Sequence, residues 1–333
     1  MNPFKATIAA IQEAENIVIT SHKSPDGDSV GSSLALYQFL TAIGKPSVVC
    51  HPDEAPLFLT WLPGAHDIVI LEKESDRAQN LMMNADLIFC LDYNSPDRTG
   101  EQMEKILRQS KAKKIMIDHH LHPDTFCDSM ISDTSSCSTA QLIYELIDQG
   151  GYLHVLNEKI GTPIYLGIMT DTGSFRYSSV QPRTHEILAN LLRNGVSNNE
   201  IHEKVFDTNT IDRLQLRSHI LAENLEIIDD FPIAILTATN SELHQYKYKK
   251  GDADGLVNVA LSIEGVQVAV FFVEREDGAV KISFRSKGDF HVNVIAMEHF
   301  AGGGHKYAAG GMSSFSLEDT VKHFKQLIPV FFS

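Results

Sequence analysis

The sequence predicts an α/β protein in which a parallel sheet with helices forms an N-terminal domain, joined by helices to a smaller mixed-sheet α/β C-terminal domain. Short, continuously apolar runs alternate with segments of helical period up to about residue 118. Helical patterns then dominate from about 136 to 225, and strand-like alternation returns after 228. We therefore expect domains at 1–190 and 228–333, connected by a helical linker at 191–227.

Five apolar runs predict the N-terminal sheet. They are "NIVIT" (16–20), "PSVVC" (46–50), "DIVIL" (67–71), "ADLIFCLD" (85–92) and "KKIMID" (113–118). Runs that are almost continuously apolar are typical of strands buried on both faces, as in a parallel sheet covered by helices. The segments 29–44 and 100–111 place apolar residues at helical spacing and supply such covering helices.

The rest of the chain changes from helices to strands. The helical segments are "SCSTAQLIYELIDQG" (136–150), "NEKIGTPIYLGIM" (157–169), "RTHEILANLLRNG" (183–195) and "IDRLQLRSHILAENL" (211–225). The predicted strands are "FPIAILTAT" (231–239), "GVQVAVFFVERE" (265–276) and "GAVKISFRS" (278–286). A glycine-rich segment at 301–312 and an amphipathic helix complete the second domain.

Composition narrows the class of protein. A hydrophobic content of 43% is enough to fill buried cores, and no apolar run reaches the length that spans a membrane. The 4 cysteines have no paired spacing, which favours reduced thiols and a cytoplasmic location over a disulfide framework. The formal net charge of −15 argues against a long nucleic-acid groove. A small phosphorylated substrate is compatible with this charge if cations in the site supply the positive charge.

Ionisable residues gather where three predicted strands end. They are His22, Asp26 and Asp28 after the first run, Asp92 at the end of the fourth, and Asp118, His119 and His120 at the end of the fifth. The carboxyl ends of parallel strands form the crevice in which ligands bind, so these groups are expected to converge. Asp and His without Cys favour Mn²⁺ or Mg²⁺ over structural zinc. Crowded carboxylates also need cations to stay ionised.

Four motifs resemble those of the DHH phosphoesterase family. They are "SHKSPDGDS" (21–29), "LDYNSPDRTG" (91–100), "IDHH" (117–120) and "MTDTGSFRY" (169–177). The segments "FRSKGDFHVNVIA" (284–296) and "GGGHKYAAGG" (302–311) resemble the C-terminal domain that accompanies one branch of the family. Length and architecture are similar to the nanoRNase and pAp phosphatase branch. The resemblance implies hydrolysis of very short RNA to mononucleotides and of 3′-phosphoadenosine 5′-phosphate (pAp) to AMP.

The resemblance also implies a set of metal ligands. It assigns His22 and Asp26 to one divalent ion and Asp28, His119 and Asp171 to a second, with Asp92 bridging the two. Mn²⁺ is the expected metal and Mg²⁺ the alternative. Two ions bridged by one carboxylate suit in-line attack on a phosphate, because they activate a water and neutralise charge.

The adjacent histidines are expected to have different roles. Successive side chains of an extended segment face opposite sides, so His119 and His120 are predicted to point apart. By resemblance His119 ligates a metal, and His120 is the catalytic residue that faces the phosphate and stabilises charge or protonates the leaving oxygen. Asp118 is expected to orient an imidazole through its far nitrogen.

Further residues are candidates for substrate binding. They are Arg98, Ser135, Ser136, Arg285, Ser286, Gly302, Gly303, Gly304 and His305. The hydroxyl-rich segment 133–141 precedes a helix, and helix N-termini bind anions. A triple glycine followed by histidine suggests a backbone cradle for phosphate, to which an arginine adds charge-assisted hydrogen bonds.

Other functions remain as alternatives. A cyclic-dinucleotide phosphodiesterase, an exopolyphosphatase or a family II pyrophosphatase would share the first domain. A RecJ-type exonuclease would need a basic channel and extra domains, and a non-enzymatic nucleotide-binding module would not need a full set of metal ligands. The expected partners are short RNA and pAp, with no long nucleic acid and no membrane. A homodimer is possible on this sequence, which does not decide the cleavage polarity or the oligomeric state.

Overall fold

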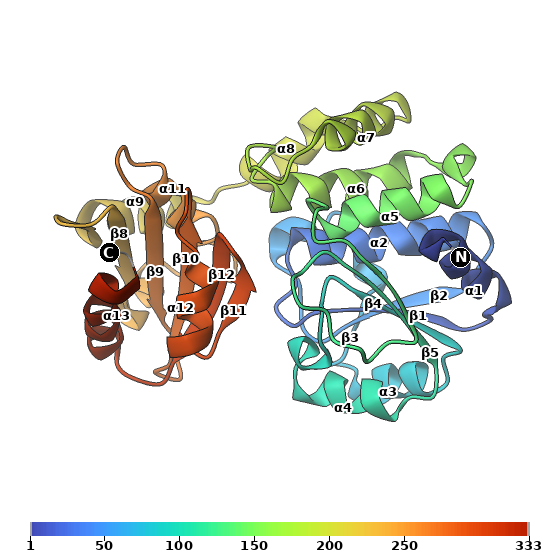
Figure 1. Ribbon diagram of the computed structural model, residues 1–333, viewed down its shortest axis with the longest axis horizontal. Coiled ribbons are helices and arrows are strands. Elements are labelled where there is room, and N and C mark those ends of the chain that lie inside the picture. The colour runs from blue at the N-terminus through green and yellow to red at the C-terminus, as the bar shows by residue number, and fades with distance from the viewer. Residues whose placement is uncertain (1, 332–333) are drawn as a thin grey trace. The chain divides into compact units, whose positions relative to one another are not determined.

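The computed structural model describes residues 2–331 and contains two compact units, 1–208 and 209–333, each built on its own six-stranded sheet (Figure 1). The first sheet is parallel and the second is mixed, which confirms the predicted α/β class. The division between the units falls within the stretch for which a helical linker is predicted.

The first sheet has the strand order β3-β2-β1-β4-β5-β6. Its strands are β1 (Ile17–Ser21), β2 (Ser47–His51), β3 (Val69–Ile70), β4 (Leu87–Leu91), β5 (Lys113–Asp118) and β6 (Ser129–Ser132). The predicted run 67–71 forms only the short strand β3, because its first residues lie in a 3₁₀ turn. The strand β6 was not predicted, since half of its residues are serines.

The register of this sheet explains why distant residues converge. Ser21 pairs with Leu91 across β1 and β4, and Leu91 pairs with Ile117 across β4 and β5. The residues that follow these strands therefore leave the sheet side by side. The order of the strands along the chain reverses at β1, which lies between β2 and β4 in the sheet. In open parallel sheets, ligands bind at the carboxyl ends of the strands next to such a reversal.

Helices cover both faces of the first sheet (Figure 1). One face carries α1 (Pro3–Glu13), α2 (Gly27–Ala42), α5 (Thr139–Gln149) and α6 (Glu158–Asp171), and the other carries α3 (Ser75–Met83) and α4 (Glu101–Gln109). The helices α7 (Pro182–Arg193) and α8 (Asn198–Phe206) pack outside α6. Short 3₁₀ turns are η1 (Leu57–Leu59), η2 (Ala65–Asp67), η3 (Pro96–Thr99) and η4 (Leu153–Val155).

Glycines allow α2 and α6 to pack unusually close together. A Cβ atom on Gly31 would lie 2.6 Å from the carbonyl oxygen of Pro163, and one on Gly27 would overlap the side chain of Thr170. Contacts this short exclude any larger residue unless a helix moves. The close contact brings the end of α6 next to the start of α2, and both ends carry predicted ligands.

The second sheet has the order β11-β12-β10-β9-β8-β7 and is mixed because only β8 and β9 run parallel. Its strands are β7 (Leu225–Ile228), β8 (Ile233–Ala238), β9 (Val268–Glu274), β10 (Val280–Ser286), β11 (Gly303–His305) and β12 (Ala308–Ser313). The helices α9 (Ile211–Glu223), α10 (Asn240–Gln245) and α11 (Leu256–Leu261) cover one face, and α12 (Val292–His299) and α13 (Leu317–Phe331) cover the other.

The helical pattern predicted to reach residue 225 ends earlier. The helix α9 ends at Glu223, and Leu225 already pairs with Leu236 in the sheet. Asn224 makes the change of direction, because its side-chain amide donates to the carbonyl oxygen of Thr237 and to Glu242. The sequence after Asn224 continues the helical pattern, but its residues pair with β8 and form a strand instead.

Within residues 2–331, no helix combines the length and the apolar character needed to cross a membrane. The cysteines at 50, 90, 127 and 137 are free thiols.

Replacing Gly31 with alanine is expected to destabilise the protein despite the higher helix propensity of alanine. The propensity gain is about 0.5–1 kcal/mol, whereas overpacking against Pro163 costs about 1–3 kcal/mol. Urea unfolding of the unit 1–208 measures the difference, and the midpoint of Gly31→Ala should be lower than that of the wild type. Thr41→Ala, at an exposed position of the same helix, is the control and should change stability by less than about 0.5 kcal/mol. A midpoint for Gly31→Ala at or above that of the wild type would contradict the close helix contact.

Candidate metal centre

The first unit brings all six proposed ligands to one edge of its sheet. His22 follows β1, Asp26 and Asp28 lie at the start of α2, Asp92 follows β4, His119 follows β5, and Asp171 ends α6. Their side-chain atoms form two groups, His22–Asp26–Asp92 and Asp28–His119–Asp171, and the atoms within each group lie within 4.8 Å of one another. Such groups of oxygen and nitrogen donors can hold metal ions.

Asp92 lies between the two groups. Its Oδ2 atom is 3.4 Å from Nε2 of His22, and its Oδ1 atom is 3.6 Å from Nε2 of His119. Thr139 donates a hydrogen bond of 2.9 Å to Oδ1, which fixes the rotation of the carboxylate. The residue has φ +62°, a left-handed conformation that is uncommon outside glycine, although aspartate adopts it more readily than most residues, and that clusters at functional sites. The two oxygens of Asp92 therefore face two different imidazoles.

The first group is oriented by backbone contacts. Nδ1 of His22 lies 2.9 Å from the carbonyl oxygen of Lys23, and because a carbonyl only accepts, this nitrogen carries the proton. Nε2 then faces Asp92 and Oδ1 of Asp26, which is 3.8 Å away. This is the usual way in which a ligating histidine is oriented by its other ring nitrogen.

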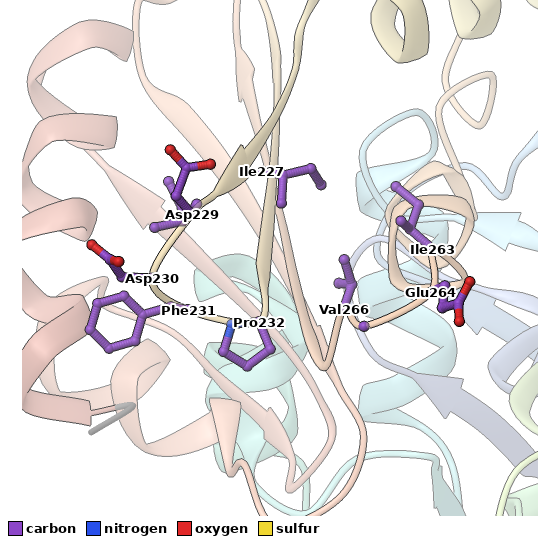
Figure 2. Close-up of a pocket in the computed structure, with 10 residues that line it drawn as sticks. Ile227, Asp229, Asp230, Phe231, Pro232, Ile263, Glu264 and Val266 are labelled. Atoms are coloured by element: carbon purple, nitrogen blue, oxygen red, sulfur yellow. The ribbon is translucent and has the colours of Figure 1, made fainter.

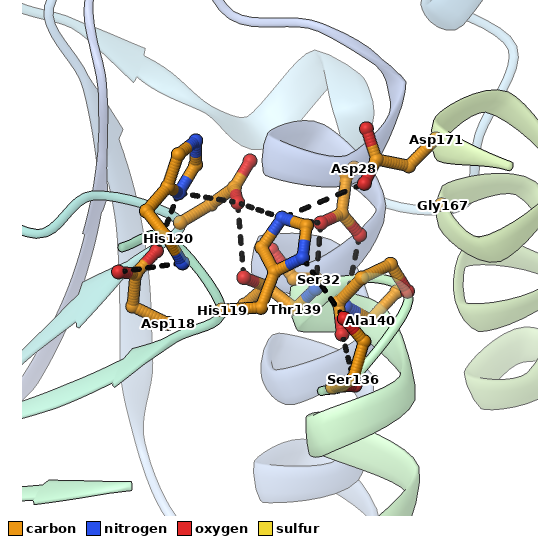
Figure 3. Close-up of polar contacts among 12 residues, drawn as sticks. Asp28, Ser32, Asp118, His119, His120, Ser136, Thr139, Ala140, Gly167 and Asp171 are labelled. Atoms are coloured by element: carbon orange, nitrogen blue, oxygen red, sulfur yellow. Dashed lines mark hydrogen bonds and ion pairs between the residues drawn. The ribbon is translucent and has the colours of Figure 1, made fainter. Parts of the chain in front are cut away.

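The second group surrounds His119 (Figure 3). Nε2 of His119 lies 3.5 Å from Asp171 and 3.8 Å from Asp28, and its Nδ1 faces the carbonyl oxygen of Ser136 at 3.3 Å. The carboxylate of Asp28 also accepts the backbone N–H groups of Thr139 and Ala140 at 2.6 and 2.8 Å. The anion bound at the N-terminus of α5 is therefore Asp28 itself.

The prediction that His119 and His120 point apart is wrong. Both imidazoles face Oδ1 of Asp92, at 3.6 and 3.8 Å, and the two rings meet edge to face with centroids 4.9 Å apart. The alternation of side chains applies only within a strand, and β5 ends at Asp118. Asp118 contacts Nδ1 of His120 at 2.7 Å and accepts its backbone N–H at 3.1 Å, so it orients His120.

The raised pKa values of several residues in the two groups indicate a site that favours bound cations. Burial raises the pKa of Asp171 to about 6, and burial together with the charges of Asp92 and Asp171 raises the pKa of Asp28 well above its usual range. Burial acts to lower the pKa of His22, but Asp26 and Asp92 outweigh it and raise the pKa to about 10. Without a metal, protons supply the positive charge that these carboxylates require. The donor set is oxygen and imidazole nitrogen without thiolate, which fits a hard or borderline divalent metal.

The other candidates in the first unit have structural contacts. The carbonyl oxygen of Arg98 accepts the N–H of Lys23 at 2.8 Å, so its backbone supports the turn after β1. The Ser135 hydroxyl donates to Asp133 at 2.6 Å, and the Ser136 hydroxyl donates to the carbonyl oxygen of Ser138 at 3.0 Å. Contacts of Arg98, Ser135 and Ser136 with substrate remain predictions.

The candidates Arg285, Ser286 and Gly302–His305 belong to the second unit. Ser286 donates to the carbonyl oxygen of Phe290 at 2.6 Å, and Arg285 donates to that of Phe284 at 2.8 Å. A Cβ on Gly302 would overlap the Gly310 carbonyl, and one on Gly304, which has φ +137°, would lie 2.6 Å from the Ala308 carbonyl. Pairing of β11 with β12 thus requires these two glycines, whereas Gly303 has no comparably close neighbour. A phosphate cradle at this hairpin remains a prediction.

Sequence reasoning missed two residues that support the ligands. Thr139 contacts Asp92 and Asp28, but a threonine at the start of a helix carries no signal of that kind. A Cβ on Gly167 would lie 2.9 Å from Oδ1 of Asp28, so only glycine lets α6 approach this carboxylate. Glycine inside a helix is costly, and its presence in the predicted segment 157–169 was an available signal.

None of the proposed metal ligands lines either of two hollows on the surface. One, of about 420 Å³, lies between the β7–β8 turn and the loop before β9 (Figure 2). The carboxylates of Asp229, Asp230 and Glu264 line it and would repel a phosphate. The other, of about 500 Å³, lies at the amino ends of β1 and β2, opposite the ligands.

Comparison with known families covers both units. The DHH family, N-terminal domain, matches residues 16–168, and the DHHA1 domain matches residues 231–329. A bifunctional oligoribonuclease and PAP phosphatase NrnA of Thermus thermophilus is 35% identical over 88% of this chain and 83% of the relative. The NrnA of Bacillus subtilis is 28% identical over 91% of each. The cyclic-di-AMP phosphodiesterase GdpP of Bacillus subtilis is 26% identical over 97% of this chain but only 49% of GdpP.

Solved structures share the architecture. An exopolyphosphatase-related protein from Bacteroides fragilis superposes with a TM-score of 0.94 at 39% identity, over 98% of this chain and 96% of that chain. RecJ of Thermus thermophilus in complex with Mn²⁺ superposes with a TM-score of 0.55 at 14% identity, over 99% of this chain and 55% of that chain. The latter likeness is one of fold alone.

Asp92→Ala is expected to reduce metal binding more than any other single ligand replacement, because Asp92 faces both groups. The affinity should fall by more than the roughly 10–100-fold that is typical of residues beyond the ligands. Elemental analysis of metal per chain after dialysis measures the change. Asp97→Asn, at an exposed carboxylate on the following turn, is the control. Wild-type metal content in Asp92→Ala would remove Asp92 from the ligand set.

Proposed function

Because the chain belongs to the DHH family, we propose that it is a metal-dependent phosphoesterase that hydrolyses short RNA oligonucleotides to mononucleotides and pAp to AMP. The observation that carries the proposal is the position of Asp92, whose two carboxylate oxygens face two groups of Asp and His ligands. The resemblance to proteins named for both activities supports the choice of substrates, since it extends over both units.

Two Mn²⁺ ions fit the ligand set, with Mg²⁺ as the alternative. The carboxylates of Asp26, Asp28, Asp92 and Asp171 carry four negative charges together, which two divalent cations balance. The presence of two imidazoles favours Mn²⁺ over Mg²⁺, because Mg²⁺ prefers a site made of oxygen alone. When bound, such ions neutralise charge on the phosphate and lower the pKa of a water.

His120 is the proposed general acid. Asp118 holds Nδ1 of this ring, and the phosphate of the substrate is proposed to lie against Nε2. A proton on Nε2 can then pass to the leaving oxygen. Asp118 fixes the rotation of the ring, while Thr139 fixes the rotation of the Asp92 carboxylate.

The second unit is proposed to bind a further phosphate of the substrate. Arg285 supplies a permanent positive charge and His305 a ring donor, and both lie partly exposed at the end of β10 and in β11. A cytoplasmic location is part of this proposal, supported by the free thiols.

Short substrates are expected to be hydrolysed best. The purified protein with Mn²⁺ should convert diadenylate and pAp to AMP, and should act at least about tenfold less efficiently on a 24-residue oligoadenylate, because a surface of net charge −15 gives extra phosphates little attraction. Chromatography of the products measures kcat/KM for these substrates, pyrophosphate and cyclic di-AMP. Preference for pyrophosphate or cyclic di-AMP would replace the proposed function by one of these activities.

His305→Ala and Arg285→Ala are expected to leave metal content unchanged and to lower kcat/KM on diadenylate by at least about tenfold, mainly through KM. Loss of a charged hydrogen bond to phosphate has about this effect. Lys281→Ala, at an exposed position of the same strand β10, is the control. Full activity in both variants would exclude this part of the second unit from substrate binding.

A further inference from the structure

The turn between β1 and α2 carries two of the proposed ligands, His22 and Asp26, and neighbouring segments hold it in place. The N–H of Lys23 donates to the carbonyl oxygen of Arg98 at 2.8 Å, and the N–H of Ser24 donates to Oδ1 of Asp53 at 2.7 Å. Ser24 has φ +58°, which a residue with a Cβ adopts only where its surroundings require it. The shape of this turn therefore depends on contacts from outside it.

Asp53 belongs to the segment that follows β2, the neighbour of β1 in the sheet. Thr20 pairs with Cys50, so this segment leaves the sheet at the same edge as the turn. Asp53 is only 7% exposed, although it is not a member of any of the metal-binding groups found within residues 2–331. A buried carboxylate that accepts a backbone N–H forms a strong, charge-assisted hydrogen bond.

The end of β2 is itself fixed to α2. His51 is completely buried, and its Nε2 lies 3.1 Å from the hydroxyl of Ser33. That hydroxyl donates to the carbonyl oxygen of Ser29 at 2.7 Å, and so accepts a hydrogen bond from the imidazole. Asp53 thus extends from an anchored strand end and can hold Ser24 in place.

Different contacts hold the two ends of the turn. His22 and Asp26 flank Ser24, but Asp26 also accepts the backbone N–H groups of Asp28 and Ser29, so a change in the left-handed residue redirects mainly His22. Asp28 is instead held by the backbone N–H groups of Thr139 and Ala140. Loss of the contact at Ser24 therefore disturbs the His22–Asp26 side and spares Asp28.

We propose that Asp53 is a positioning residue that sets the metal affinity of the His22–Asp26–Asp92 group and has little influence on the Asp28–His119–Asp171 group. The inference rests on the proposed two-ion centre. It assigns a role to a carboxylate that is neither a ligand nor a substrate contact. Its chemistry is that of an acceptor, so an amide at the same position should replace it.

The test is a titration of the metal-free, full-length protein with Mn²⁺, in which electron paramagnetic resonance measures the free ion. The wild type is expected to bind two ions. Asp53→Leu keeps the approximate size of the side chain but removes the acceptor. It should lower the affinity for one ion by about 10–100-fold and leave the affinity for the other within about threefold of the wild type. Asp53→Asn retains an acceptor for Ser24 and should bind both ions within about threefold of the wild type.

Each outcome is decisive. Wild-type binding of a single ion would overturn the two-ion centre, whereas two ions in the wild type and unchanged binding in Asp53→Leu would overturn only the role of Asp53. Equal weakening of both ions in Asp53→Leu, or a loss in Asp53→Asn as large as in Asp53→Leu, would also overturn it. Thermal melting of the metal-free variants identifies any that do not fold, and Asp53→Ala then takes the place of leucine in the same comparison.

Discussion

Repulsion among carboxylates that converge on one sheet edge is the constraint on which the rest of this structure depends. Asp28, Asp92 and Asp171 lie within reach of one imidazole, His119, and burial weakens the screening that water would provide. The fold compensates with fixed donors: two N–H groups of α5 bind Asp28, and Thr139 binds Asp92. Burial and the neighbouring carboxylates raise the pKa of Asp28 and of Asp171, and bound cations would relieve the same repulsion.

The packing of the first unit follows from the need to hold these carboxylates still. Helix α2 carries Asp28 and helix α6 carries Asp171, and their close contact through Gly31 prevents the two helices from sliding apart. Gly167 lets α6 reach the carboxylate of Asp28 itself. Glycine lowers the intrinsic stability of both helices. It occurs at the positions where the two backbones must lie close together to place the ligands. The glycines in α2 and α6 therefore allow the close packing that holds the carboxylates at the sheet edge.

The fold by itself does not select the substrate. RecJ shares the architecture at 14% identity, so the fold is not confined to proteins similar in sequence to this chain. In the proposed function, the charge of the chain and the second unit provide the discrimination between substrates. An acidic surface disfavours long polyanions, while a hairpin whose Gly302 and Gly304 are required by backbone pairing presents His305 in a defined place.

The sequence alone determined the fold class and the six candidate ligands. Apolar runs report burial on both faces, and the order of strands places His22, Asp92 and His119 at one edge, because both signals are local or follow from chain order. Tertiary structure alone decided how the ligands are oriented. Both histidines face Asp92, Asp28 occupies the start of α5, and Asp53 holds Ser24. These contacts join residues up to 112 positions apart, and hydrogen bonds and packing at such separations leave no periodic trace in the sequence.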